Sequence, residues 1–328
     1  MDNVLLRRSQ PISAKKNPYN RFDLVENPFP RSPTVTPGSH DPRVNGEIYC
    51  KSLRGEEQKQ FERLLVPHPE RSSTRPMASL MDLATRRGRG IGKTAFLNHQ
   101  RRQIMTDMGN QYTNGAYVLL AAHLIPEGGG RTRKSWQFIR LIAQSLNTNR
   151  CIASAIWRLR AFSGVIPDEI MDKINSDDLE GTIGNNRWLE NEGINVAFDL
   201  NASVKRKLRD HGVSEEIAHA LATYGTSHET WEQGFLSQQS DYQWRQMGST
   251  WVFDEFVRLF QAAEINQVLL LVDEVEKIVS PQNRQERRAF AEDIRLFFID
   301  GPFQSVLASP HFGVLWTISP YLQELWQV

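Results

Sequence analysis

Glycines, a lysine and a threonine stand close together at residues 87–94, which read RGRGIGKT. Glycines let a backbone curl so that consecutive N–H groups point at an anion, and a following helix adds its positive N-terminal end. Lys93 would reach the β- and γ-phosphates of a nucleotide, and the Thr94 hydroxyl would take one position on Mg²⁺. We expect the phosphate-binding residues to be Gly88, Arg89, Gly90, Ile91, Gly92, Lys93, Thr94 and Ala95.

The spacing of this loop departs from the usual phosphate-binding pattern at one position. That pattern places its first glycine five positions before the glycine that precedes the lysine. Arg87 occupies that position here, and Gly88 follows one place later. We therefore expect a slightly re-registered loop. The alternative is a glycine turn that carries a solvated lysine.

Two acidic residues, Asp273 and Glu274, directly follow the apolar run VLLLV at residues 268–272. A continuous apolar run without alternation predicts a central strand of a parallel sheet, buried on both faces. Ligands bind at the carboxyl ends of such strands. Asp273 would hold the Mg²⁺ shell, and Glu274 would orient and activate the attacking water. The alternative is a pair of solvated acids that cap the following helix.

Together, the two segments resemble the Walker A and Walker B motifs of P-loop ATPases that carry an additional catalytic glutamate. This ASCE class includes the AAA+ and origin-recognition-like ATPases, the transposition regulators, and the KAP and STAND families. The resemblance covers roughly residues 76–140 and 250–328. It implies ATP and Mg²⁺ as cofactors, with Glu274 and Lys93 as catalytic residues. Because the chain has no Asn-Lys-x-Asp segment of the kind that reads guanine, ATP is favoured over GTP.

The same resemblance implies a polar sensor of the γ-phosphate near the end of a strand that we expect at residues 312–319. Ser319 is the first choice and Thr317 the alternative, because the side-chain parity of a strand depends on its register. AAA+ proteins normally continue into a further strand and a helical lid, for which nine residues after Ser319 are too few. We therefore expect a minimal core, a fragment, or a lid that comes from a partner.

Several predicted elements would position these residues. The apolar run at 78–84 precedes the loop as a strand, and a helix follows it from about residue 93 to 108. A further strand is expected at 116–122. These elements predict an α/β fold, a P-loop NTPase core with a central, mainly parallel sheet flanked by helices. A mostly helical insertion and a proline-rich N-terminal arm would be added to it.

The chain divides into four predicted segments. Residues 1–76 carry ten of the sixteen prolines and are expected to form an extended arm, since proline breaks helices and central strands. Lys93 and Asp273 are 180 positions apart, roughly a hundred more than a plain core requires. Residues 77–146 and 249–328 would form the two halves of the core. Residues 147–248 would form the helical insertion.

Composition sets broad limits on location. The chain has 328 residues, 23% of them charged, and a net charge of +1, which is ordinary for a soluble globular protein. The two isolated cysteines make neither a disulfide framework nor a metal-ligand spacing. The N-terminus lacks a signal pattern, and no run reaches ~18 apolar residues. We expect a cytoplasmic protein with no membrane contact.

The expected function is that of an ATPase that acts as a motor or switch for a partner effector in a multi-protein complex. The complex would be a homo-oligomer or include a protein effector, with a link to DNA transactions or phage defence. The alternative is a STAND-like, nucleotide-gated assembly scaffold with little turnover, and a small-molecule kinase is the outsider. Nucleic acid would be contacted through the assembly, aided by local positive charge. That charge lies at Arg86, Arg87, Arg89, Arg101, Arg102, Arg131, Arg133 and Lys134.

Overall fold

The computed structural model describes residues 41–45, 49, 54–65, 77–81, 92–249, 254–295 and 312–318. Five residues predicted to bind the nucleotide lie outside these ranges, as does most of the predicted N-terminal arm. The five are Gly88, Arg89, Gly90, Ile91 and Ser319.

The described chain combines helices and strands and is mostly helical, around a small parallel sheet. The strands are β1 (Met77–Met81), β2 (Leu119–Leu124), β3 (Gln267–Val272) and β4 (Phe312–Ile318). Their order is β1-β4-β3-β2, and every neighbouring pair is parallel. All six residues of β3 are buried. The prediction of a central parallel strand at 268–272 is therefore confirmed.

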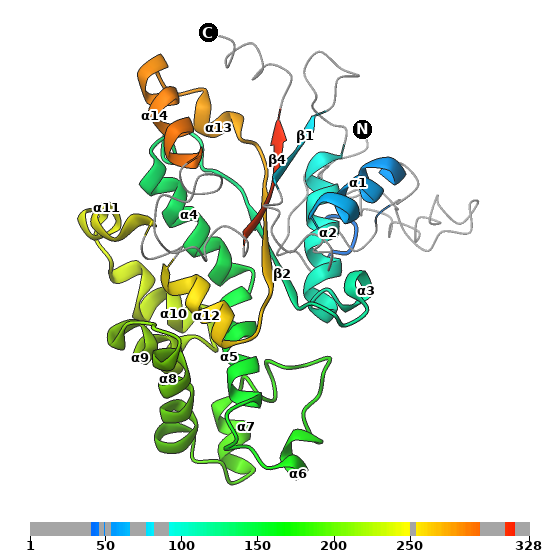
Figure 1. Ribbon diagram of the computed structural model, residues 1–328, viewed down its shortest axis with the longest axis vertical. Coiled ribbons are helices and arrows are strands. Elements are labelled where there is room, and N and C mark those ends of the chain that lie inside the picture. Colours follow the sequence, from blue (N-terminus) through cyan, green and yellow to red (C-terminus); the bar gives the residue numbers. More distant parts are fainter. Residues whose placement is uncertain are drawn as a thin grey trace, which may run out of the picture.

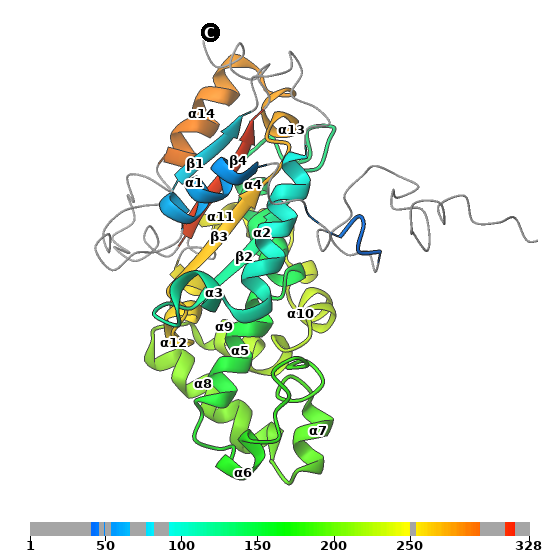
Figure 2. The same cartoon turned by 90° about the vertical axis from the view of Figure 1, so that its right-hand side faces the viewer.

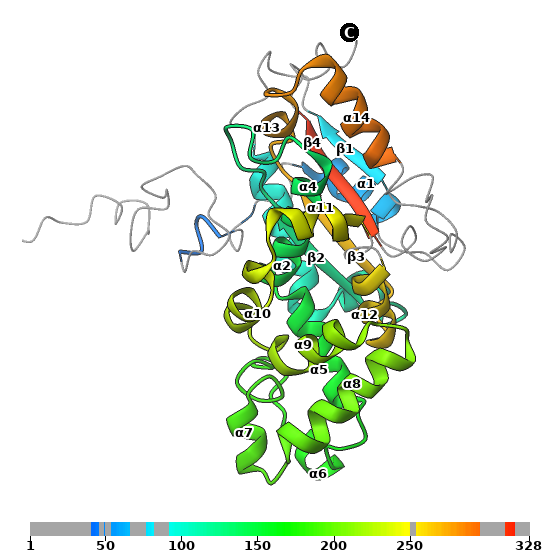
Figure 3. The same ribbon diagram turned by 90° about the vertical axis from the view of Figure 1, so that its left-hand side faces the viewer.

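Alternate side chains of β2 and β3 face opposite sides of the sheet, as the period of two requires. One set packs against α1 (Gly55–Leu65) and α2 (Lys93–Asp107), and the other packs against helices that include α4 (Ser135–Thr148). Figure 2 shows α1 and α2 over the first face, and Figure 3 shows α4 over the second. The smaller of the two clusters contains Phe61, Phe96, Leu97, Ile104, Leu119, Ala121, Leu269 and Leu271.

The turn between α2 and β2 places the strand later than the sequence suggested. Gly109 has φ 80, and a Cβ there would lie 2.6 Å from the Leu119 Cβ, so only glycine fits. A short helix, α3 (Asn110–Thr113), follows. Ala116 N then donates to Thr113 O at 3.0 Å, which keeps residue 116 in the turn. The strand expected at 116–122 consequently begins at Leu119 and continues to Leu124.

Residues 149–249 form helices and turns and contain no strand. Figure 1 shows this segment extending from the sheet, with α6 and α7 at its far end. Within the described part of the chain, no helix combines the length and the apolar character that a membrane span needs. The helices are α5 (Cys151–Ala161), α6 (Asp168–Met171), α7 (Asn186–Asn191), η5 (Val196–Leu200), α8 (Asn201–Asp210), α9 (Glu215–Tyr224), α10 (His228–Gly234), η6 (Leu236–Gln238) and α11 (Asp241–Ser249).

The helical segment has two packing environments. Its inner helices share one hydrophobic cluster with β2, β3, α4 and α12 (Val257–Ala262). Its outer part has a separate cluster beyond α5, in which Trp157 and Leu189 are buried. Arg160 lies fully buried in α5 and donates to Ile183 O at 3.0 Å and to Asn186 Oδ1 at 2.8 Å. The inner helices are thus continuous with the sheet, and α5 carries the outer part.

Two helices follow β3 at the carboxyl edge of the sheet. They are α13 (Glu276–Val279) and α14 (Arg284–Arg295). Figure 1 shows both at the end toward which the arrows of β1 and β4 point. Because the strands are parallel, this is the edge where the sequence places the acidic pair.

Candidate functional site

The described end of the glycine-rich loop has the backbone conformation that its sequence requires. Gly92 adopts φ 80, which is left-handed, directly before α2 begins at Lys93. A Cβ at this glycine would meet no atom of the described residues within 4 Å. Glycine adopts this left-handed backbone angle without the steric cost that a side chain would bring. Gly92 O accepts from Phe96 N at 2.9 Å, which makes the first helical hydrogen bond.

The first turn of α2 meets the end of β3. The Thr94 hydroxyl donates a hydrogen bond to Asp273 Oδ2, across 179 positions of sequence. Asp273 is buried, with 3% of its surface exposed, and Thr94 is half-buried. Ala95 is half-buried beside Thr94. The structure therefore brings the first turn of α2, which starts at Lys93, to Asp273 at the end of β3.

Backbone contacts fix the Asp273 carboxylate from the other side. Asp273 N donates to Leu124 O at 2.9 Å, which extends the pairing of β3 with β2 by one residue. Its Oδ1 accepts from Glu274 N at 2.9 Å. His123 is also buried here, with Nε2 at 3.8 Å from Asp273 Oδ2. The carboxylate is thus held by the Thr94 hydroxyl on Oδ2 and by the Glu274 N–H on Oδ1.

Glu274 combines an unusual backbone with an accessible side chain. Its φ is 49, in the left-handed region that non-glycine residues rarely adopt. Such residues cost of order 1–3 kcal/mol and persist where the surroundings fix them. Here the bond from Glu274 N to Asp273 contributes to that fixation. The carboxylate forms an ion pair with Lys277, and 44% of the side chain is exposed.

The donor atoms in this site suit Mg²⁺. A hydroxyl and a carboxylate are hard oxygen ligands, and Mg²⁺ usually keeps several waters and binds one or two carboxylates plus substrate phosphates. Among the described residues, no group of three or more His, Cys, Asp and Glu side chains could hold a metal ion. A Mg²⁺ ion at Thr94 and Asp273 would therefore complete its shell with water or phosphate oxygens.

The expected sensor strand lies between the two halves of the site. β4 pairs with β1 on one side and with β3 on the other. Thr317 is opposite Leu80, and Trp316 is opposite Val272, so the carboxyl end of β4 points to the same edge as Asp273. Ser319 follows the described strand. The choice between Thr317 and Ser319 stays open.

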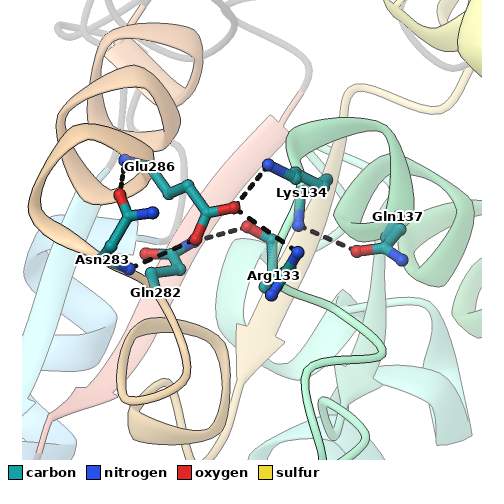
Figure 4. A network of polar contacts seen from close by, with 6 residues as sticks. All are labelled: Arg133, Lys134, Gln137, Gln282, Asn283 and Glu286. Atoms are coloured by element: carbon teal, nitrogen blue, oxygen red, sulfur yellow. Dashed lines mark hydrogen bonds and ion pairs between the residues drawn. The ribbon is translucent and has the colours of Figure 1, made fainter.

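A polar network joins the loops that follow β2 and β3 (Figure 4). Lys134 Nζ donates to Glu286 Oε1 at 2.6 Å, and Arg133 Nη2 lies 3.6 Å from the same oxygen. The buried Gln282 side chain donates to Arg133 O. We call these four residues, together with Asn283, the loop clasp. It ties the start of α14 to the start of α4, at the edge of the sheet that holds Asp273.

The sequence contained one signal for the loop clasp. Asn283 and Glu286 are three residues apart, and this spacing is typical of a capping box. Asn283 Oδ1 accepts from Glu286 N at 2.9 Å, and Asn283 N donates to Glu286 Oε2 at 3.2 Å. The hydrogen bond from Lys134 to Glu286 joins residues that are 152 positions apart, and no sequence pattern predicts it.

Several basic residues of the expected positive surface have partners within the chain. Arg133 and Lys134 pair with Glu286, and Arg131 pairs with Glu127 at 3.1 Å. Arg101, which belongs to the expected positive charge, is half-buried, and burial lowers the pKa of its guanidinium. Their positive charge is therefore partly compensated or covered.

No protein-family model, curated protein or solved structure matches this chain.

Proposed function

We propose that the chain binds and hydrolyses ATP as a P-loop ATPase, and that it acts as a motor or switch for a partner in an assembly. The observation that carries the proposal is the hydrogen bond from Thr94 to Asp273. A glycine-lysine-threonine sequence at a helix start and an acid at the end of a buried parallel strand meet through this bond. That combination is what binding of a triphosphate with a metal ion requires.

Each residue has a distinct role in the proposed reaction. Lys93 and the N–H groups at the start of α2 bind the phosphates and compensate their charge. Thr94 and Asp273 are the residues that would hold Mg²⁺, which would compensate the negative charge of the phosphates. Glu274 accepts a proton from the attacking water, a task that suits its accessible carboxylate. Lys277 orients that carboxylate through their ion pair.

Phosphate release by the purified chain with ATP and Mg²⁺ tests the proposal. The wild-type chain should release phosphate, and Lys93→Ala should lower the rate by roughly 100-fold or more, as expected when a charge-stabilising donor is lost. Glu274→Gln should lower the rate by about 100-fold or more while ATP binding is kept. Glu276→Gln, two residues further along, is the matched control and should be neutral.

Two results would overturn the proposed function in different ways. A Lys93→Ala rate equal to the wild-type rate would show that turnover does not use this site. ATP binding and ATP-driven assembly without turnover in the wild-type chain would select the nucleotide-gated scaffold instead.

A further inference from the structure

A cavity of about 700 Å³ lies beside β2, the last strand of the described sheet. Its walls come from α2, α4 and the start of α5, and α10 contributes His228. Figure 1 shows α2 and α4 on opposite sides of β2. Ile125 and Thr148 line it and are exposed, so it opens to solvent. Its volume lies within the range of about 300–1,000 Å³ that is usual for small-molecule sites.

The polar lining of the cavity suits an anion. Two arginines, Arg101 and Arg150, and two histidines, His123 and His228, line it, and no Asp or Glu does. Arg150 is ion-paired with Glu180, which lies outside the lining. Arg101 is half-buried, and its Nε donates to Asn98 Oδ1 at 3.2 Å, which holds the guanidinium in place. A guanidinium with further N–H groups is well suited to phosphate or carboxylate oxygens.

His123 supplies an independent sign of a ligand. It is buried, with 6% of its surface exposed, and it lines the cavity. Neither ring nitrogen has a hydrogen-bond partner within the part of the chain that the structure describes. Buried polar atoms are nearly always hydrogen-bonded, so an unpartnered imidazole at a cavity wall indicates a missing partner. Asn149 Nδ2 donates to His123 O at 3.2 Å, which fixes the backbone behind the ring.

The remaining walls are apolar. Met105, Ile125, Leu141 and Trp157 contribute to the lining from three helices and the end of β2. The volume is far larger than a free phosphate ion requires. A ligand that fills the cavity would therefore combine an anionic group with a planar or apolar body.

We propose that this cavity is a second ligand site, separate from the proposed ATP site, for a phosphorylated small molecule the size of a nucleoside monophosphate. Its phosphate binds Arg101 and accepts a hydrogen bond from His123. Its base packs against Met105 and Trp157. Because His123 Nε2 lies 3.8 Å from Asp273 Oδ2, the ligand would be one side chain away from the candidate metal ligand.

Binding of AMP to the full chain, measured by calorimetry, tests the proposal. The wild-type chain should bind AMP more tightly than it binds adenosine or inorganic phosphate. Arg101→Gln should weaken AMP binding by at least about tenfold, the effect of losing a charge-assisted pair. Arg102→Gln, on the same helix but outside the lining, is the matched control. Lys93→Ala should leave AMP binding unchanged, which separates this site from the proposed ATP site.

Two outcomes would overturn the second site. One is that Lys93→Ala abolishes AMP binding while Arg101→Gln keeps it, and the other is that the wild-type chain binds no AMP at millimolar concentration. Should Arg101→Gln fail to fold, Gln144→Trp fills the cavity from α4 without removing a charge, and it should also abolish AMP binding. AMP binding that survives Gln144→Trp would contradict the proposal. Loss of ATP hydrolysis in any variant does not bear on this result.

Discussion

Thr94 has one partner in the structure and would have another in the proposed nucleotide complex. In the structure its hydroxyl donates to Asp273 Oδ2, and in the nucleotide complex the same oxygen would face the metal ion. In the proposed ATPase, the hydroxyl would therefore hold the carboxylate in position before a nucleotide binds. This double use makes the hydroxyl, rather than the size of the side chain, the important property.

Thr94→Val removes the hydroxyl at nearly constant volume and should weaken Mg²⁺-dependent ATP binding by about tenfold or more. The reason is that a hydrogen bond to a charged group contributes about 1.5–3 kcal/mol. Thr94→Ser keeps the hydroxyl and should bind nearly as well as the wild-type chain. Thr106→Val on the exposed part of α2 removes a bond to Arg102 O and serves as the control. Equal affinity of the valine and serine variants at position 94 would contradict this role.

The thiol of Cys151 is buried, and its burial determines its reactivity. Cys151 starts α5, is fully buried, and lies 3.6 Å from Ala121 O. Burial raises the pKa of its thiol to about 12. At pH 8 only about one part in ten thousand would be thiolate, the reactive form.

We therefore expect Cys151 to resist iodoacetamide at pH 8 in the native chain and to react on unfolding. The measurement is mass spectrometry of a Cys50→Ser variant, so that a single thiol is followed. Rapid labelling of Cys151 in the native chain would contradict this expectation, because it would show that the packing of α5 against β2 does not exclude the reagent from the thiol.

At the scale of elements, the loop clasp connects the segments that follow β2 and β3. It joins the loop before α4 to the start of α14 through Lys134 and Glu286. Hydrogen bonding from Lys134 is the main cause that lowers the pKa of the Glu286 carboxyl, with a further contribution from Asn283 N. A lowered folded-state pKa means that the carboxylate stabilises the fold above its unfolded pKa. That stabilisation is lost as the pH falls through the folded value, which is below 4.5.

Glu286→Gln should increase hydrogen exchange at residues 280–286 at pH 7, because the charged partner of Lys134 is removed. The difference between the variant and the wild-type chain should shrink as the pH falls below 4.5 and through the lowered folded-state pKa of Glu286, because the carboxylate then loses its charge in the folded chain as well. Glu292→Gln removes an exposed pair with Arg288 on the same helix and is the matched control. A difference that persists unchanged at low pH would exclude the carboxylate as its cause.

The sequence predicted local elements better than their contacts. The helix expected from about residue 93 to 108 is present as α2, Lys93–Asp107. The apolar run at 268–272 was enough to predict a buried parallel strand. Strand β2 was placed too early, because the residues around Ala116 are apolar but bond within a turn. The left-handed backbone of Glu274 had no local signal, since it depends on the Asp273 side chain and on neighbouring elements.

At the scale of the molecule, one hydrophobic cluster runs from the sheet into the helical segment. Leu270 of β3 and Trp231 of α10 belong to the same cluster, and both are fully buried. Trp244 of α11 is also part of it. The sheet that positions Asp273 and the helices between residues 147 and 248 therefore stabilise one another.

Leu270→Ala should lower the free energy of unfolding by about 2–5 kcal/mol, as is usual for a buried leucine. A denaturant titration can be followed by tryptophan fluorescence, to which Trp231 and Trp244 contribute, and by far-ultraviolet circular dichroism. The midpoints of the two unfolding transitions should shift by the same amount. Phe198→Ala is the control, because that side chain is 78% exposed and should change stability little. A fluorescence transition that stays in place while the dichroism transition shifts would show that the helical segment unfolds on its own.

The proposed function requires that Thr94 and Asp273 serve a single Mg²⁺-ATP site. The most direct test is the affinity of ATP, with Mg²⁺ present, for the wild-type chain, Thr94→Val, Asp273→Asn and the double variant. We expect each single variant to bind ATP more weakly than the wild-type chain. The double variant should lose little more affinity than the single variant that binds ATP more weakly, because residues in contact are coupled. Additive losses in the double variant, or no ATP binding by the wild-type chain, would contradict the account.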